Sequence, residues 1–318
     1  MEKKCSVYKT SIGGQAVLEG VMMRGPESIA VAVRKPDKEI IVDKQPLGKV
    51  RKNKFLKLPI IRGCVNFIDS MVIGIKALMF SAKFFDVDED GNEIEQEPGK
   101  FEKWLDEKLG SEKALNAVIY LSVAFSIIMS VGLFMLLPAF LAGFVEKFSD
   151  SHTLYIATEG AVRILLFIAY LLLVSRMKDI QRVFMYHGAE HKSIHCYEHG
   201  EELTVENVKK HTRLHPRCGT SFLLIVMVIS IIIFFFIRFG NIFLKLLARL
   251  VLIPVVAGIS YEIIKFAGRH DNLFTRIISY PGTLFQYITT KEPDDSQIEV
   301  AIASLKAVIP EEEGSDKW

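Results

Sequence analysis

The chain has 318 residues, half of them hydrophobic and 22 of them Phe, with a net charge of +2 and a mean hydropathy of +0.28. Residues 114–145 and 218–237 contain no charged side chain, although charged residues make up 24% of the sequence. Because a membrane-spanning helix needs about 20 apolar residues, this segregation excludes a wholly soluble domain. It predicts an α-helical polytopic membrane protein with soluble parts.

The distribution of charge and of cysteine narrows the class further. Residues 1–58 hold thirteen Lys/Arg against six acidic residues, and by the positive-inside rule this domain stays in the cytoplasm. We expect no secretory signal peptide, and no specific nucleic-acid partner, because the basic residues alternate with acids and lack an RNA-binding signature. The cysteines are too widely spaced for a disulfide scaffold or a four-thiolate zinc site; they are Cys5, Cys64, Cys196 and Cys218.

The N-terminal region predicts a small antiparallel β meander over residues 12–46, with strands at 29–33 and 39–42 joined by a turn. Gly13 and Gly14 permit unusual backbone angles or close approach by another segment. Residues 59–85 follow as an amphipathic helix with one polar stripe, which is typical of a helix in the membrane interface; a helix buried under the soluble domain is the alternative. The stripe consists of Arg62, Asn66, Asp69, Lys76 and Lys83.

Residues 86–113 predict an acidic linker and a short helix. The run from Asp86 to Glu97 matches the spacing of a calcium-binding loop. Glu93 occupies the position that should be aliphatic, and Pro98 follows the last ligand position. We therefore expect a solvated loop that does not bind calcium tightly.

Four membrane helices are predicted at about 114–145, 154–175, 219–238 and 242–266, with Glu159 able to pair with Arg163 one turn later. Four crossings return the chain to the cytoplasm, and the eight Lys/Arg of the middle loop agree. The resulting division is a cytoplasmic β-rich domain (1–58), an interfacial amphipathic helix (59–85), an acidic linker (86–113), a first transmembrane hairpin (114–175), a cytoplasmic His-rich loop (176–218), a second transmembrane hairpin (219–266) and a cytoplasmic helical tail (267–318). In the tail, residues 294–309 predict an amphipathic helix whose apolar face holds Ile298, Ala301, Ile302, Leu305 and Val308.

The His-rich loop contains the motif with the clearest chemistry. His187, Glu190 and His191 form H-x-x-E-H, the inverted zinc-protease motif. Two imidazoles one helical turn apart can chelate one Zn²⁺, and the carboxylate can act as general base. A polar surface helix with incidental histidines is the open alternative.

Three residues are candidates for a third metal ligand. His215 and Cys218 stand three apart at the start of a membrane helix, where they could equally belong to a membrane-anchoring turn. Glu262 follows His191 by 71 residues near the inner end of the last membrane helix, where an ionisable group is a functional candidate. A pair with Lys265 or Arg269 would satisfy Glu262 structurally instead.

Several motifs together closely resemble the bacterial YqhQ family over nearly the whole chain. They are the segments 11–24, 186–192, 215–221, 262–268 and 289–293. The resemblance implies a bacterial inner-membrane protein from a family interpreted as metal-dependent enzymes.

Two functions follow as expectations. The first is a zinc-dependent membrane enzyme, a hydrolase of a peptide or lipid-linked substrate at the cytoplasmic membrane face. The second is a non-catalytic membrane-biogenesis or scaffold factor, which binds anionic lipid, another membrane protein or a ribosome-associated partner.

Overall fold

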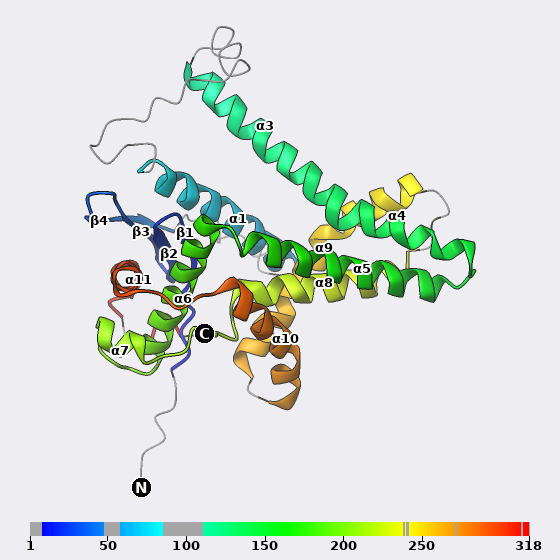
Figure 1. Cartoon of the computed structure of the whole chain (residues 1–318). Coiled ribbons are helices and arrows are strands. Elements are labelled where there is room, and N and C mark those ends of the chain that lie inside the picture. Colours follow the sequence, from blue (N-terminus) through cyan, green and yellow to red (C-terminus); the bar gives the residue numbers. More distant parts are fainter. Residues whose placement is uncertain are drawn as a thin grey trace.

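The computed structural model describes residues 8–47, 58–84, 111–237, 239, 242–270, 272–312 and 314–317. The calcium-like pattern between Asp86 and Glu97 lies outside these residues, so the expectation for it stays a prediction. Within them, the chain is mostly helical with one small N-terminal sheet (Figure 1).

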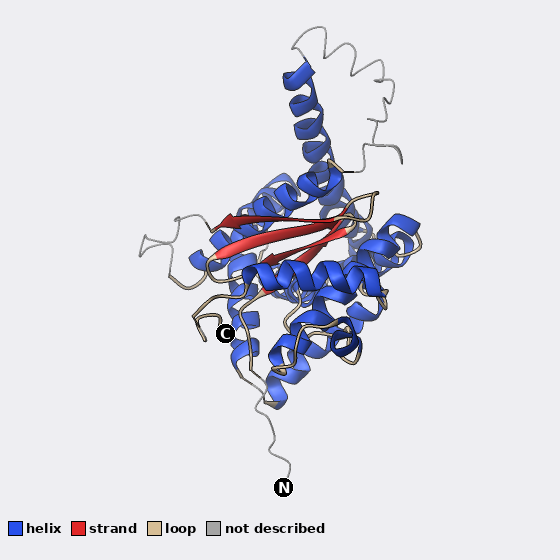
Figure 2. Cartoon of the chain, turned by 90° about the vertical axis from the view of Figure 1, so that its left-hand side faces the viewer, coloured by secondary structure: helices blue, strands red, loops and turns tan. Residues whose placement is uncertain are grey.

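The predicted antiparallel meander is confirmed. Its four strands are β1 (Gly13–Val17), β2 (Gly20–Arg24), β3 (Ser28–Arg34) and β4 (Ile40–Pro46). They form one sheet (Figure 2) and lie in the order β1-β2-β3-β4. The register pairs Met22 with Val31 and Val33 with Ile41. Alternate side chains therefore point to opposite faces, and both faces of β2 and β3 are covered.

One face of the sheet packs on α6 (Lys178–Glu198) and α11 (Asp295–Val308). Val21, Met23, Ala30 and Ala32 share one buried core with side chains of both helices. The five apolar positions predicted for the tail helix are all buried, so its expected face is confirmed, and a capping box formed by Asp294 and Gln297 starts the helix. The expected segments 1–58, 176–218 and 267–318 thus contribute to one folded unit, which also carries the short helix α7 (Val205–Lys209).

The other face of the sheet is covered by α1 (Ile61–Ala82), whose Ala77 packs with Val17, Met22 and Val33. At its N-terminal end α1 crosses α9 so closely that a Cβ on Gly63 would come within 2.8 Å of the Gly258 Cα. The expected polar stripe of α1 is partly used inside the protein, because Arg62 pairs with Glu262 and Asn66 donates to Tyr261. Most exposed side chains of the helix are apolar, with Lys76 and Ser70 among them, which suits a bilayer surface better than water.

The apolar helices extend away from this unit (Figure 1). They are α3 (Ser111–Val131), a π-helical turn η3 (Gly132–Leu136), α4 (Leu137–Gly143), a 3-10 turn η4 (Val145–Lys147), α5 (His152–Val174), α8 (Gly219–Phe235), α9 (Ile242–Arg269) and α10 (Leu273–Thr289). Among the described residues, four helical segments are long and apolar enough to cross a membrane: 61–82, 121–143, 152–174 and 243–269. The expected span at 219–238 corresponds to α8, which is apolar but has 17 residues, the lower end of the range for a span.

A cluster of charged side chains is buried where α5, α8 and α9 meet. Arg163 donates to Glu159 at 2.6 Å, as the spacing predicted, and also to the hydroxyl of Ser230 at 3.0 Å. Arg249, which the sequence did not link to this pair, donates to the second oxygen of Glu159 at 2.6 Å.

The two ends of the described chain lie side by side. Thr10 forms a β-bridge with Lys317, and the amide of Ser11 donates to the carbonyl of Asp316 at 2.5 Å. Both ends therefore belong to the folded unit around the sheet.

Candidate metal centre

The H-x-x-E-H residues lie in the middle of α6, on the side that faces β1 and the start of α8. His187 and His191 are one turn apart, and their ring centroids are 4.5 Å apart. Gly188 allows the segment after α10 to pass against α6, because a Cβ there would come within 2.1 Å of the Lys291 carbonyl oxygen. This close passage brings the C-terminal end of α10 to the histidines.

Both histidines are oriented by backbone carbonyls. The Nδ1 of His187 lies 2.9 Å from the carbonyl oxygen of Thr289, and the Nδ1 of His191 lies 2.6 Å from that of Arg213. Since a carbonyl only accepts, each Nδ1 carries a proton, and Nε2 is the ring nitrogen left to bind a metal. Metal-ligating histidines in proteins are held in this way.

Cys218 completes the group. It is the N-cap of α8 and buried, and its sulfur lies 3.2 Å from the Nε2 of His187. One ligand atom from each of His187, His191 and Cys218 lies within 4.8 Å of the others. Two imidazoles and a thiolate are ligands that Zn²⁺ prefers, at about 2.0–2.3 Å from the ion. The residues present therefore fit a single zinc-type ion.

The charges of His187 and Cys218 depend on each other. Burial alone would raise the pKa of the Cys218 thiol, but the adjacent His187 and His191 outweigh it and hold that pKa well below its ordinary value. Burial alone would lower the pKa of His187, yet the neighbouring sulfur raises it to about 9. The pair is thus a thiolate beside an imidazolium, and the thiolate is the form of cysteine that binds metals.

Glu190 lies between the two histidines in sequence and faces β1. Its Oε1 accepts a hydrogen bond from the backbone amide of Gly14 at 2.9 Å, and burial raises its pKa above the ordinary value, although the neighbouring imidazoles oppose this. The expected close approach at the glycine pair is present, since a Cβ on Gly14 would lie 3.0 Å from the Glu190 Cδ.

A cavity of about 620 Å³ gives these side chains a common space between β1, α6 and the start of α8. His187, Glu190, His191, His215 and Cys218 all line it. Of the residues expected at the site, these five are brought together around one cavity.

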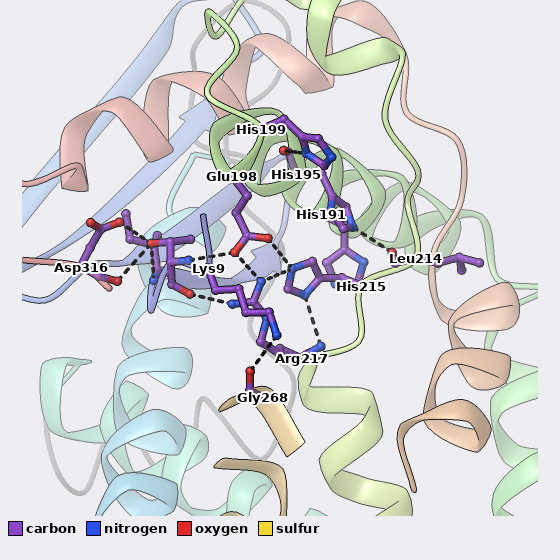
Figure 3. Close-up of polar contacts among 12 residues, drawn as sticks. Lys9, His191, His195, Glu198, His199, Leu214, His215, Arg217, Gly268 and Asp316 are labelled. Carbon is purple, nitrogen blue, oxygen red and sulfur yellow. Dashed lines mark hydrogen bonds and ion pairs between the residues drawn. The ribbon is translucent and has the colours of Figure 1, made fainter. Parts of the chain in front are cut away.

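His215 nevertheless has partners that the metal group does not share. Its Nε2 lies 3.8 Å from Glu198 and 3.3 Å from the guanidinium of Arg217, and burial lowers its pKa to about 4. Glu198 in turn pairs with Arg217 and accepts from the amide of Thr10 at 2.9 Å (Figure 3). His195, Glu198 and His215 also form a group with metal-ligand spacing, but this carboxylate is already neutralised by Arg217.

Glu262 lies away from the metal group. The side chain of Arg62 on α1 donates to it at 2.6 Å, and of the two expected partners the charge of Lys265 also acts on it, more weakly than Arg62. The structure therefore joins Cys218, and neither His215 nor Glu262, to the pair His187 and His191.

A third group with suitable spacing consists of Cys196, Glu201 and His211 at the end of α6. Burial raises the pKa of Cys196 to about 11, and its thiol donates to the carbonyl of Glu202 at 3.6 Å. It behaves as a protonated structural thiol.

Sequence reasoning missed the groups that orient the site. Thr289 lies in segment 289–293, one of the motifs of the family resemblance, but a backbone carbonyl carries no side-chain signal, so the sequence did not indicate that Thr289 and Arg213 orient the histidines. For Gly14 the sequence predicted close approach by another segment, but not the hydrogen bond from its amide to Glu190.

Comparisons with known proteins place the chain in a family. The chain is 36% identical over 304 residues to the "Uncharacterized protein YqhQ" of Bacillus subtilis (strain 168). The aligned residues cover 93% of this chain and 92% of the relative. No solved structure matches the chain. The family described as "Protein of unknown function (DUF1385)" matches residues 58–311. The chain, as its sequence motifs indicated, therefore belongs to the DUF1385 family, with YqhQ among its members.

Proposed function

We propose that the protein is a metal-dependent membrane enzyme, a hydrolase that binds one Zn²⁺ through His187, His191 and Cys218. The observation that carries the proposal is the convergence of two carbonyl-held imidazoles on one thiolate. Structural zinc sites are usually closed by four protein ligands, whereas catalytic sites use three and leave one position open. Three ligands facing a cavity of about 620 Å³ match the second type.

The chain's own residues define the rest of the chemistry. The ion, when bound, supplies a Lewis acid at the wall of the cavity. Glu190 lines the same cavity, and burial raises its pKa above the ordinary value, which suits a group that accepts and returns a proton. The amide of Gly14 fixes one carboxylate oxygen, so the other is the one that can exchange protons with a substrate.

The topology follows from the shared core. The sheet, α6 and α11 pack together, so all three lie on the same side of the membrane, and an even number of crossings must separate each from the next along the chain. Because α1 packs against the sheet, we infer that α3–α4 and α5 cross as the first hairpin. By the same reasoning α8 and α9 cross as the second. The basic N-terminal region supports a cytoplasmic location for the sheet, both termini and the metal centre, with the hairpins in the inner membrane of a bacterial cell.

A second function is favoured by the burial of the ligands. His191 is 1% and Cys218 8% exposed, as in a structural zinc site. In that case the ion would fix α6 to α8, and the folded unit would serve as a binding platform for a membrane protein, a ribosome-associated factor or another part of the membrane-biogenesis machinery.

Elemental analysis of the full-length protein, purified in detergent without a histidine tag, tests the metal. We expect about one zinc per chain, as for a single three-ligand site. Absence of stoichiometric metal contradicts the proposal, and rapid alkylation of Cys218 in such a protein would indicate a nucleophilic cysteine paired with His187 instead.

The Glu190→Gln variant separates the two functions. It keeps the size and hydrogen-bonding capacity of the side chain but cannot accept a proton, so we expect full zinc content together with loss of function in a complementation assay of a deletion strain. If the variant keeps its zinc and complements fully, the ion is structural and the platform function replaces the enzyme.

A further inference from the structure

A second cavity of about 570 Å³ lies next to the metal centre, between α1, α8 and α9. Apolar side chains form most of its wall away from Cys218. They are Phe67, Met71, Ile75 and Leu78 of α1, Phe222 of α8 and Ile264 of α9. Its volume is within the range of small-molecule sites, which is roughly 300–1,000 Å³.

The two cavities share a wall. Five residues line both of them: Gln15, Ser70, Arg217, Cys218 and Gly219. The metal ligand Cys218 therefore stands where the apolar space meets the polar one. A molecule that extends from one cavity into the other must itself have an apolar and a polar end.

The apolar cavity is placed for access from a bilayer. Its walls on α1 and α9 belong to two helices that are long and apolar enough to lie in a membrane. On α1, Met71, Ile75 and Leu78 line the cavity and are also 40–49% exposed. These side chains make the outer surface of α1 continuous with the cavity, so a hydrocarbon chain can reach it without passing through water.

The wall suits a hydrocarbon chain better than a peptide. Each peptide unit that enters an apolar space needs partners for its N–H and C=O groups. Among the polar side chains there, Asn66 and Tyr261 hydrogen-bond to each other at 2.8 Å, and Gln15 packs against Gly74. A hydrocarbon chain needs no such partners.

We propose that this cavity binds an acyl chain of a membrane amphiphile, whose polar part then reaches the space around Cys218, His187 and Glu190. The proposal rests on the proposed function, and it names the substrate class as acyl-bearing lipids. The cavity selects the chain by burial of methylene groups, and the metal centre meets the linkage between the chain and its polar part.

Gly219 offers a clean way to obstruct the junction. A Cβ there has no heavy atom within 4 Å, although the residue lines both cavities. Gly219→Ala and Gly219→Leu should therefore fill this space in two steps without displacing the backbone. Gly143→Leu is the matched control, because its Cβ also meets nothing within 4 Å and Gly143 lies at the end of α4, outside both cavities.

The experiment uses the full-length protein in phosphatidylethanolamine/phosphatidylglycerol vesicles that contain phosphatidylglycerol with a diazirine near the end of one acyl chain. After irradiation, adducts are located by mass spectrometry and expressed relative to those on α3 and α5, which report lipid around the protein. We expect an excess at Met71, Leu78 and Phe222. Gly219→Leu should reduce it by about tenfold, the factor for roughly two methylene groups losing their burial, with a smaller reduction for Gly219→Ala and none for Gly143→Leu.

Adducts spread evenly over the apolar helices, or an excess that Gly219→Leu leaves unchanged, would overturn the proposal and indicate surrounding lipid only. Zinc content measured on the same samples keeps the two proposals apart. If zinc is bound but the cavity is not labelled, only the proposal of an acyl site fails. If the cavity is labelled but no zinc is bound, the proposal of a metal centre fails and that of the acyl site stands.

Discussion

The metal group on α6 and the charged cluster among α5, α8 and α9 both bury titratable side chains, but they use the polar atoms differently. In the charged cluster both carboxylate oxygens of Glu159 accept from a guanidinium, one from Arg163 and one from Arg249. In the metal group a backbone carbonyl accepts a hydrogen bond from the Nδ1 of each histidine, so the Nε2 atoms remain for a ligand in the group. In the first arrangement two guanidinium groups occupy both oxygens of one carboxylate, and in the second the ligand atoms face a common point.

This difference teaches how to separate a structural cluster from a candidate site. Burial and charge are common to both, so neither identifies function by itself. What distinguishes the metal group is that its donor atoms converge on one another beside a cavity, whereas the charged cluster connects three helices and lines none of the cavities described above. Removing a residue should therefore affect metal binding in one region and stability in the other.

The largest effect is expected for the metal ligands. His187→Ala, His191→Ala and Cys218→Ala each leave two ligands, so zinc affinity should fall by more than the roughly 10–100-fold seen when only an outer hydrogen-bond partner is lost. Competition with a chromogenic chelator measures this affinity. His199→Ala is the control on the same helix, because its Nδ1 bonds to the helix carbonyl of His195. Equal zinc affinity of ligand and control variants would show that the convergence on Cys218 holds no ion.

In the charged cluster, Glu159→Gln should reduce stability without changing zinc content. The substitution leaves two buried guanidinium groups without a counter-charge, and breaking such a buried pair costs about 3–5 kcal/mol. Thermal unfolding in detergent measures the effect. Glu299→Gln is the control, since Glu299 pairs with Arg34 but its side chain is 51% exposed, and surface pairs contribute about 0–1 kcal/mol. A loss of zinc in Glu159→Gln would mean that the two regions are coupled.

The sequence predicted the parts of both regions that depend on helical spacing. Residues four apart face together on a helix, which sufficed for His187 with His191 and for Glu159 with Arg163. The same rule predicted the buried face of α11, and the β-prone segments 29–33 and 39–42 with the turn between them predicted the sheet. These features are local, so one segment is enough to specify them.

The parts that depend on packing between helices could not be predicted. His215, Cys218 and Glu262 were equivalent as third ligands, because spacing along the chain does not fix distance in space. Because α1 packs on α9, Glu262 pairs with Arg62. The start of α8 brings Cys218 to His187. For the same reason the sequence did not predict that Arg249 joins the charged cluster or that two backbone carbonyls contact the metal group.

A smaller, pH-dependent effect is expected at Glu198, which links the start of α8 to the N-terminal segment. Burial alone would raise the pKa of Glu198, but contact with His215 and the charge of Arg217 lower it from 4.5 to about 2. A carboxyl group whose pKa is lowered by folding stabilises the protein at pH values above the pKa that the group has in the unfolded chain. This contribution should be complete above about pH 4.5 and lost toward pH 2, and it amounts to about 3 kcal/mol from the size of the shift.

Acid-induced unfolding of the wild type and of Glu198→Gln checks this expectation. The variant should be less stable at neutral pH, and the difference between the two proteins should shrink as the pH falls below 4.5. A difference that stays constant down to pH 2 would mean that Glu198 does not carry its charge in the folded protein.

The smallest effect is expected where the sheet meets the metal group, at the glycine pair of β1. A Cβ on Gly14 would lie 2.6 Å from the carbonyl oxygen of Met22 and 3.0 Å from the Glu190 Cδ, whereas a Cβ on Gly13 would meet nothing within 4 Å. Gly14→Ala must therefore displace β1 or Glu190, and overpacking of this kind costs roughly 1–3 kcal/mol. Gly13→Ala should stay within about 0.5 kcal/mol of the wild type. Because Glu190 is not a ligand, both variants should keep their zinc, and in the complementation assay only Gly14→Ala should be impaired. Equal stability and equal function of the two variants would show that Gly14 does not position Glu190, and the general-base assignment would lose its structural support.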